Sequence, residues 1–331
     1  MKNKKFVIPD GMEYFMPNEA KLFENLKQKA LKKLISLGYS FVNPPIFDSL
    51  SNLLSLKATD LDIETLTITD QQSGGDIGIR ADITPQIAKI DYQISNAKGI
   101  NKYCYMGDIL KSSSRDFDRK NPYQLGTEIF GVSNKNSDLD IIRSMIEIVS
   151  LSREKRLIIE IGNVSFINNL LDSFEISDEK RRFLVRLINL KSKSEIKLFC
   201  KENKMDKKKS NFLIELIGLS GDIKVLKEIQ RLIKSNNMNF VNEINELKFV
   251  TKGIEKLRSP CELQIDLCEL HGYEYQSSIV FGAYVPNFRK EIARGGRYNA
   301  YSTGKNSYRE ATGFSLDLKD IFNLSIVNER K

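Results

Sequence analysis

The chain has 331 residues, and its 51 Lys+Arg against 43 Asp+Glu give a formal net charge of +8. Hydrophobic residues make up 41% and charged residues 28%, which is a globular composition that excludes disordered and collagen-like proteins. No apolar run reaches the roughly 18 residues of a transmembrane helix, and no apolar segment follows the basic start, so we expect a cytoplasmic protein without a secretory signal. With one histidine and no C-x-x-C pair, we expect neither a metal site nor a cofactor.

The positive charge is concentrated in one region. Residues 171–258 carry 20 Lys+Arg and 13 Asp+Glu, and the rest of the chain is almost balanced. A basic surface of this kind could bind nucleic acid. The alternative, which we favour, is lysines on solvated helix faces, because the densest run, Lys201–Lys209, also contains two acids and no aromatic ring.

The first third of the chain begins with an amphipathic helix. Pro17, with Asn18 as N-cap, indicates its start, apolar residues recur at i+4, and Gly38 ends it. A hairpin is expected next, because two alternating segments flank a Gly-Gly turn. Thr84 followed by Pro85 is typical of an N-cap and first turn. The elements expected here are a helix from Asn18, strands over 39–42, 66–70 and 77–80, and a helix from Pro85 towards Ala97.

The remaining elements alternate between strand and helix patterns. The pattern predicts strands over 103–111 and 123–132, a helix over 138–151, a strand over 157–161, helices through 165–258, strands over 263–267, 278–284 and 292–298, and a last helix from near Gly313. Strands, a helical segment and strands again indicate an α+β fold with an antiparallel sheet and a helical insertion. We find no internal repeat.

A polar face on one strand is the first candidate site. Period-two geometry puts Gln124, Gly126 and Glu128 on one face, where the glycine leaves room for a ligand. A carboxylate and a carboxamide suit a small cationic ligand such as an amino acid. Asp82 and Thr84 could add an acceptor for an ammonium group. The alternative is the solvated side of a sheet, with Thr84 acting only as an N-cap.

Two glycine-containing segments near the end of the chain could complete a pocket. Gly295-Gly296 allows close backbone approach, and Tyr298 could form a wall. Tyr275, in the segment from Gly272, adds a second aromatic wall. The alternatives are a tight turn for the glycines and edge-strand packing for the tyrosines.

These segments, in this order, resemble the catalytic domain of histidyl-tRNA synthetase. The segments that carry the resemblance are Gly38–Pro45 (dimerisation motif), Arg80–Thr84, Tyr105–Lys111 and Tyr123–Gly131 (the motif 2 hairpin), His271–Tyr275 and Gly295–Asn299. The resemblance implies a class II aminoacyl-tRNA synthetase-like core over 1–164 and 259–331, with a helical insertion module over 165–258.

Three departures from the synthetase pattern bear on activity. Lys111, His271 and Asp320 stand where the family has arginines that serve ATP binding and activation. Lysine lacks the bidentate guanidinium fork, histidine is mostly neutral at pH 7, and an acid repels phosphate. We therefore expect no adenylation and no catalytic residue. We also expect no anticodon-binding domain.

The amino-acid side of the pocket is retained. This pattern, together with the segments Arg80–Gln86 and Ala311–Ser315, resembles the ATP phosphoribosyltransferase regulatory subunit family. The histidine-binding residues that the resemblance implies are Asp82, Thr84, Gln124, Glu128, Tyr275 and Tyr298. It further implies a non-catalytic subunit required for the first step of L-histidine biosynthesis. Its expected partners are a short-form catalytic subunit, a second copy through the core, and L-histidine as feedback effector, with no membrane or nucleic-acid partner. The alternative is a truncated histidyl-tRNA synthetase-like enzyme, or a tRNA-binding module that uses the basic region.

Overall fold

The structure is a computed structural model that describes residues 8–54, 65–72, 74–112, 119–132, 134–257, 261–269, 276–286, 288–304 and 307–329. The chain forms two compact units. Unit 1 consists of Met1–Val132, Ser144–Glu154 and Ala300–Lys331, and unit 2 of Ser133–Arg143 and Lys155–Asn299. The predicted boundaries of core and insertion follow the sequence pattern instead and stay a prediction.

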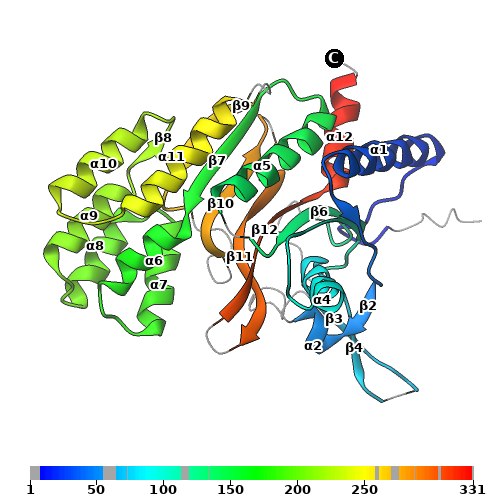
Figure 1. The fold of residues 1–331 in the computed structure, drawn as a ribbon, viewed down its shortest axis with the longest axis horizontal. Coiled ribbons are helices and arrows are strands. Elements are labelled where there is room, and N and C mark those ends of the chain that lie inside the picture. Colours follow the sequence, from blue (N-terminus) through cyan, green and yellow to red (C-terminus); the bar gives the residue numbers. More distant parts are fainter. Residues whose placement is uncertain are drawn as a thin grey trace, which may run out of the picture. The chain divides into compact units, whose positions relative to one another are not determined.

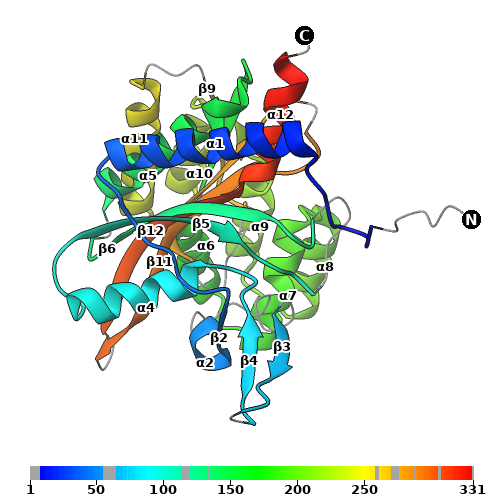
Figure 2. The same ribbon diagram turned by 90° about the vertical axis from the view of Figure 1, so that its right-hand side faces the viewer.

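Unit 1 is built on four strands in the order β1-β5-β6-β12. Strand β1 is parallel to β5, and the other neighbours are antiparallel. Helices α1 and α12 lie on one side of these strands and α4 on the other (Figures 1 and 2). Its elements are α1 (Pro17–Ser36), β1 (Ser40–Phe41), β2 (Phe47–Ser49), α2 (Leu50–Leu53), β3 (Leu66–Thr69), β4 (Asp76–Ile79), α4 (Thr84–Ser95), β5 (Asn101–Asp108), β6 (Tyr123–Phe130), the 3₁₀ turn Ser150–Ser152, β12 (Ser307–Asp317) and α12 (Leu318–Glu329).

Helix α1 confirms the predicted amphipathic helix but begins one residue before the expected cap. Met16 is the N-cap, Pro17 is the first helical residue, and the Glu19 carboxylate accepts a hydrogen bond of 3.0 Å from the Met16 backbone N–H. Asn18 therefore lies inside the helix. The buried face repeats at helical spacing through Phe23, Leu26, Ala30 and Leu34.

The three strands β2, β4 and β3 form a separate small sheet that includes the predicted hairpin. Helix α4 follows it, and here the predicted N-cap was wrong. Ile83 occupies the N-cap position and Thr84 is already helical. The Asp82 carboxylate takes over the capping role, because it accepts a hydrogen bond of 2.8 Å from the Thr84 N–H.

The largest correction concerns the end of unit 1. A helix was expected from near Gly313, but Ser307–Asp317 forms strand β12, which pairs with β6 over Ala311–Asp317. Helix α12 begins only at Leu318, where the Asp317 carboxylate accepts from the Lys319 N–H at 3.0 Å. The small residues before Phe314 fit a strand between two neighbours, and this tertiary pairing overrides the local helix signal.

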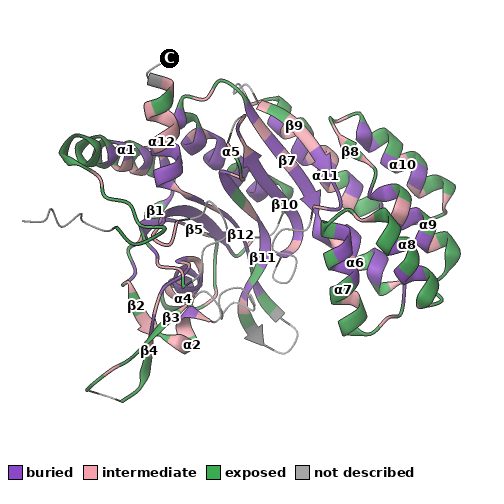
Figure 3. Ribbon diagram, turned by 180° about the vertical axis from the view of Figure 1, so that it is seen from behind, coloured by how far each residue is buried: buried purple, intermediate pink, exposed green. Residues whose placement is uncertain are grey.

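Unit 2 combines strands in the order β11-β10-β7-β9-β8 with helices through Val164–Glu255, which confirms the predicted helical segment. Helix α5 and strand β11 contribute residues to both units. Figure 3 shows that the strands are largely buried and that the helices expose one face. The elements of unit 2 are α5 (Lys135–Val149), β7 (Leu157–Asn163), α6 (Val164–Asp172), α7 (Asp178–Asn189), α8 (Lys193–Glu202), α9 (Lys207–Leu216), β8 (Ser220–Gly221), α10 (Val225–Ser235), α11 (Val241–Glu255), β9 (Cys261–Asp266), β10 (Gln276–Tyr284) and β11 (Ala293–Gly304).

Throughout the described ranges, no helix combines the length and the apolarity that a membrane span requires.

Candidate functional site

Four of the six predicted histidine-binding residues come together in unit 1. The Gln124 amide donates to the Asp82 carboxylate at 2.8 Å and accepts from the Ile83 N–H at 2.8 Å. Thr84 lies 3.5 Å from the Glu128 carboxylate. Gln124 and Glu128 are only 6% and 2% exposed, so they do not form the solvated side of a sheet. We call Asp82, Thr84, Gln124, Glu128 and Tyr105 the polar cluster.

Tyr105 is the member of the polar cluster that the sequence analysis missed. It is fully buried opposite Gly126 in the β5–β6 register, and its hydroxyl lies 2.9 Å from the Thr84 hydroxyl. The same hydroxyl donates to Glu128 at 3.2 Å. Burial, and next the Glu128 charge, raise the pKa of Tyr105, so the phenol stays protonated and able to donate.

The space above Gly126 is filled by the protein itself. A Cβ at this position would overlap the Tyr105 ring and would lie 2.7 Å from the Phe314 carbonyl oxygen. The expectation that this glycine leaves room for a ligand was therefore wrong: its role is to admit Tyr105. Since Tyr105 in turn holds Glu128, the glycine positions the carboxylate indirectly.

Gly313 on β12 has a similar role, and it offers a test of the cluster. It lies opposite Glu128, and a Cβ there would overlap the Glu128 carboxylate and lie 2.6 Å from the Thr127 carbonyl. Gly313→Ala should therefore lower the free energy of unfolding by about 1–3 kcal/mol, measured by urea denaturation. In a Glu128→Ala background the cost should fall by at least about 0.5 kcal/mol, because the overlapping group is gone. Strictly additive costs would contradict this packing.

Of the two other predicted histidine-binding residues, the structure describes Tyr298. Tyr298 belongs to unit 2, where it is buried and opposes Gln276 in the β10–β11 register. Tyr275 and His271 lie outside the described residues. The close approach expected at Gly296 is made by the side chain of Gln276, which a Cβ on Gly296 would overlap.

Arg297, between those glycines and Tyr298, forms a buried ion pair within unit 2. Its Nε donates to both oxygens of Asp138 at 3.1 Å, and a second nitrogen donates to Glu246 at 3.1 Å. The side chains of Arg297 and Asp138 are 7% and 0% exposed. Helix α5 supplies Asp138 and helix α11 supplies Glu246, so Arg297 joins strand β11 to both helices.

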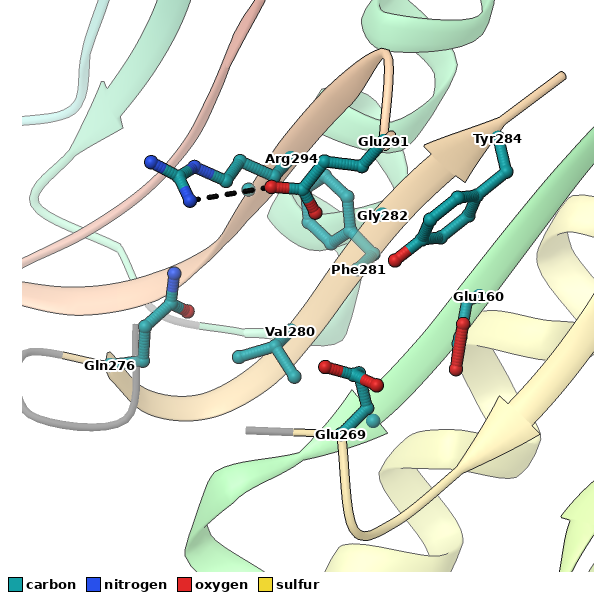
Figure 4. A pocket seen from close by; sticks show the side chains of 11 residues that line it. Glu160, Glu269, Gln276, Val280, Phe281, Gly282, Tyr284, Glu291 and Arg294 are labelled. Atoms are coloured by element: carbon teal, nitrogen blue, oxygen red, sulfur yellow. Dashed lines mark hydrogen bonds and ion pairs between the residues drawn. The ribbon is translucent and has the colours of Figure 1, made fainter. Parts of the chain in front are cut away.

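Unit 2 also contains an acidic pocket beside Gln276 (Figure 4). Glu160, Glu269 and Glu291 line it, and Arg294 donates to Glu291 at 3.3 Å. Burial, and next Glu291, raise the pKa of Tyr284 at its wall. The cavity of about 20 Å³ has room for a water molecule or two, and its carboxylates favour a cation over an anion. The described residues contain no cluster with metal-ligand geometry.

Of the three positions implied to have lost an arginine, Lys111 and Asp320 are described. Asp320 is 4% exposed and forms an ion pair with Arg119, from the segment that precedes β6. Arg119 also donates to Asp317 at 3.0 Å and to Glu13 at 2.9 Å. We call Arg119, Asp317 and Asp320 the carboxylate clamp. The backbone N–H of Lys111 donates to the Lys120 carbonyl at 2.9 Å.

The sequence analysis did not predict the carboxylate clamp, in which Asp320 is a counter-ion of Arg119. Lys319 reinforces it by donating to the Asn121 carbonyl at 2.7 Å. Although burial opposes the charge of Arg119, Asp320 and Asp317 raise the pKa of the guanidinium. Helix α12 therefore holds the residues that lead into β6 through ionic contacts.

Comparison with known proteins agrees with this fold. The histidyl-tRNA synthetase family model matches residues 11–321. An ATP phosphoribosyltransferase regulatory subunit from Methylococcus capsulatus is 32% identical over 326 residues, 98% of this chain and 80% of that protein. The protein of the same name from Saccharophagus degradans is 32% identical over 97% of this chain and 82% of its own length.

Solved structures show the same fold. An ATP phosphoribosyltransferase regulatory subunit/histidyl-tRNA synthetase from Bacillus halodurans matches with a TM-score of 0.83 at 20% identity, over 98% of this chain and 84% of the other. A chain of the ATP phosphoribosyl transferase complex from Thermotoga maritima matches with a TM-score of 0.68 at 20% identity, over 90% and 97% of the two chains. The predicted class II synthetase-like fold is thus confirmed, and the chain belongs to the ATP phosphoribosyltransferase regulatory subunits of the histidyl-tRNA synthetase family.

Proposed function

We propose that this chain is the non-catalytic regulatory subunit of an ATP phosphoribosyltransferase, the enzyme of the first step of L-histidine biosynthesis. It assembles with a catalytic subunit and with a second copy of itself, and it binds L-histidine as the feedback inhibitor. Relatives of about 30% identity that carry this name over nearly the full chain support the regulatory role.

The polar cluster is the observation that carries the histidine proposal. It brings two carboxylates, Asp82 and Glu128, together with a carboxamide and two hydroxyls on hydrogen-bonded side chains. Glu128, the carboxamide and the Tyr105 hydroxyl are on buried residues, whereas Asp82 and Thr84 are partly exposed. Asp82 and Thr84 address the α-ammonium group, and Glu128 and Gln124 address the imidazole. The assignment of Tyr275 and Tyr298 to histidine binding stays a prediction from the sequence.

The carboxylate clamp supports the non-catalytic part of the proposal. Nucleotide activation needs cationic groups at the phosphates, each worth about 3–4 kcal/mol in the transition state when it is well placed. Asp320 is an acid instead, and its carboxylate already forms an ion pair with Arg119. The substitutions at Lys111 and His271 act in the same direction.

The edge of unit 1 supports self-association. Strand β1 is the outermost strand of its sheet among the described residues, and Phe41 on it is 41% exposed. An exposed strand edge with an apolar side chain is suited to pairing with another chain. The mass of the reconstituted complex reports on this part of the proposal.

Glu128→Gln tests the histidine site. The variant keeps the size of the side chain and removes the charge, so histidine should lose a charge-assisted hydrogen bond of about 1.5–3 kcal/mol. We expect the histidine concentration for half-inhibition of phosphoribosyl transfer, measured on a complex reconstituted with a short-form catalytic subunit, to rise at least about tenfold.

Glu262→Gln is the matched control, because Glu262 is exposed and pairs with the surface residue Arg156 in unit 2. It should leave inhibition unchanged. An unaltered half-inhibition in Glu128→Gln would remove the histidine site from the polar cluster. A chain that neither assembles with the catalytic subunit nor alters its activity would contradict the regulatory role itself.

A further inference from the structure

The helical part of unit 2 contains an internal repeat, contrary to the sequence analysis. Apolar residues of helix α7 recur 29 positions later in helix α9 and at its C-cap, and all of them are buried except Phe183, which is 46% exposed. The matching pairs are Phe183 and Phe212, Leu184 and Leu213, Leu187 and Leu216, and Ile188 and Ile217. The same period therefore relates two helical hairpins, α6–α7 and α8–α9.

The turns of the two hairpins repeat as well. Glu175 and Lys204, again 29 positions apart, both have a left-handed backbone, with φ of 52° and 51°. Two residues further on, Ser177 and Asp206 are the N-caps of α7 and α9. Asp206 accepts from the Lys209 N–H at 2.8 Å, and Ser177 accepts from the equivalent lysine. The two turns are thus alike in backbone and in capping.

A groove of about 380 Å³ lies between the two equivalent turns, which Figure 1 shows on neighbouring helices of unit 2. Its lining is symmetric: the turns contribute Phe174 and Asn203, Glu175 and Lys204, Ile176 and Met205, Ser177 and Asp206, Lys180 and Lys209, together with Ser173. Lys209 joins the two turns by donating to the Ser173 carbonyl at 2.6 Å. The volume falls in the range of small-molecule sites, about 300–1,000 Å³.

The charges of this turn groove favour an anion. Three lysines line it against two acids, and one of the acids, Asp206, is used as an N-cap. No arginine lines it, so the bidentate fork that suits carboxylates is missing, whereas ammonium groups bind phosphate as point charges. The Ser177 hydroxyl can donate to a phosphate oxygen, whereas the Ser173 hydroxyl already donates to the Leu170 carbonyl at 2.6 Å. Phe174, Ile176 and Met205 offer an apolar floor.

We propose that the turn groove binds the phosphate group of a small phosphorylated metabolite, with its organic part on the apolar floor. The site lies wholly within unit 2 and goes beyond the proposed histidine regulation. Part of the excess of basic residues over 171–258 then serves phosphate binding, in addition to solvation of the helix faces.

Calorimetric titration of the full chain with ribose 5-phosphate tests the proposal, and inorganic phosphate reports on the anion alone. Lys180→Ala and Lys204→Asn each remove one charge from the groove, and asparagine tolerates the left-handed backbone at 204. Each should weaken binding about two- to fivefold. The control is Lys207→Ala with Lys208→Ala, which removes two charges from α9 outside the lining and should leave affinity unchanged.

Absence of binding at millimolar ribose 5-phosphate, or a loss in the control as large as in the groove variants, excludes a phosphate site here. A short RNA duplex is the second probe. If RNA binds more tightly than ribose 5-phosphate and depends equally on all four mutated lysines, the surface is a general nucleic-acid binder and the proposal fails.

Discussion

Asp138→Ala is expected to lower the free energy of unfolding by about 3–5 kcal/mol, because it leaves the buried guanidinium of Arg297 without its main counter-charge. Glu246 remains near Arg297, but its side chain is 29% exposed and meets the guanidinium through a single nitrogen. Urea denaturation followed by far-ultraviolet circular dichroism suits the measurement, since the chain has no tryptophan for fluorescence.

The matched control is a surface pair of the same chemistry in the same unit. Arg156 and Glu262 form a two-pronged contact with side chains 60% and 55% exposed, so Glu262→Ala should leave stability almost unchanged. Adding Arg297→Met to Asp138→Ala should recover part of the loss, because no charge is then buried alone. If Asp138→Ala costs as little as Glu262→Ala, the buried pair does not hold β11 to its helices.

The free energy of unfolding of unit 1 should depend on pH between 4 and 7 because of the titration of Asp317. Burial, and next the neighbouring Asp320, raise the pKa of Asp317 from 3.8 to about 6. The native state therefore binds this proton more tightly than the unfolded chain, and the contribution of Asp317 to stability is full below pH 4 and is lost as the pH rises through 6. Two pKa units correspond to about 3 kcal/mol.

Asp317→Asn isolates this effect, because asparagine does not titrate and its amide oxygen can still accept from the Tyr123 N–H and the Lys319 N–H. The stability of the wild type minus that of the variant should fall by about 3 kcal/mol from pH 4 to pH 7. A difference that instead grows with pH would mean that the attraction of Arg119 outweighs burial and depresses the pKa.

Local signals were enough to predict most elements of the fold. Helix α1, the small hairpin and the strands β5 and β6 follow from periodicity, Pro and Gly positions that act within a few residues. The expected helix near Gly313 failed because strand β12 is stabilised by pairing with β6, almost 190 residues earlier in the chain. No window of local sequence contains that information.

In the candidate site, too, local geometry could be predicted from the sequence and long-range contacts could not. Gln124 and Glu128 share a face because strand geometry has a period of two, which the sequence alone reveals. The contact of Tyr105 with Gly126 depends on the register between β5 and β6, which the pattern within each strand does not fix. The pairing of Arg119 with Asp320 joins residues 201 positions apart, and the resemblance indicated only that Asp320 is not an arginine.

The hairpin repeat escaped detection because only its core recurs. Leu184 and Leu187 have buried equivalents in α9, but the exposed Arg186 between them corresponds to the acidic Glu215. The two left-handed turn residues are a glutamate and a lysine rather than glycines, so the turn signal was absent as well. Backbone geometry preserves the repeat where the surface has diverged.

The carboxylate clamp has an evolutionary consequence. If an arginine once stood at position 320, as the family resemblance implies, its return would set two guanidinium groups against each other, because Arg119 already occupies that place with Asp317 and Asp320 as its counter-ions. The substitution Asp320→Arg would therefore lower the free energy of unfolding before it restored any cationic surface for phosphate. Asp320 is thus part of the ionic contacts that hold unit 1 together, and a change to arginine there is opposed by the stability of the fold itself.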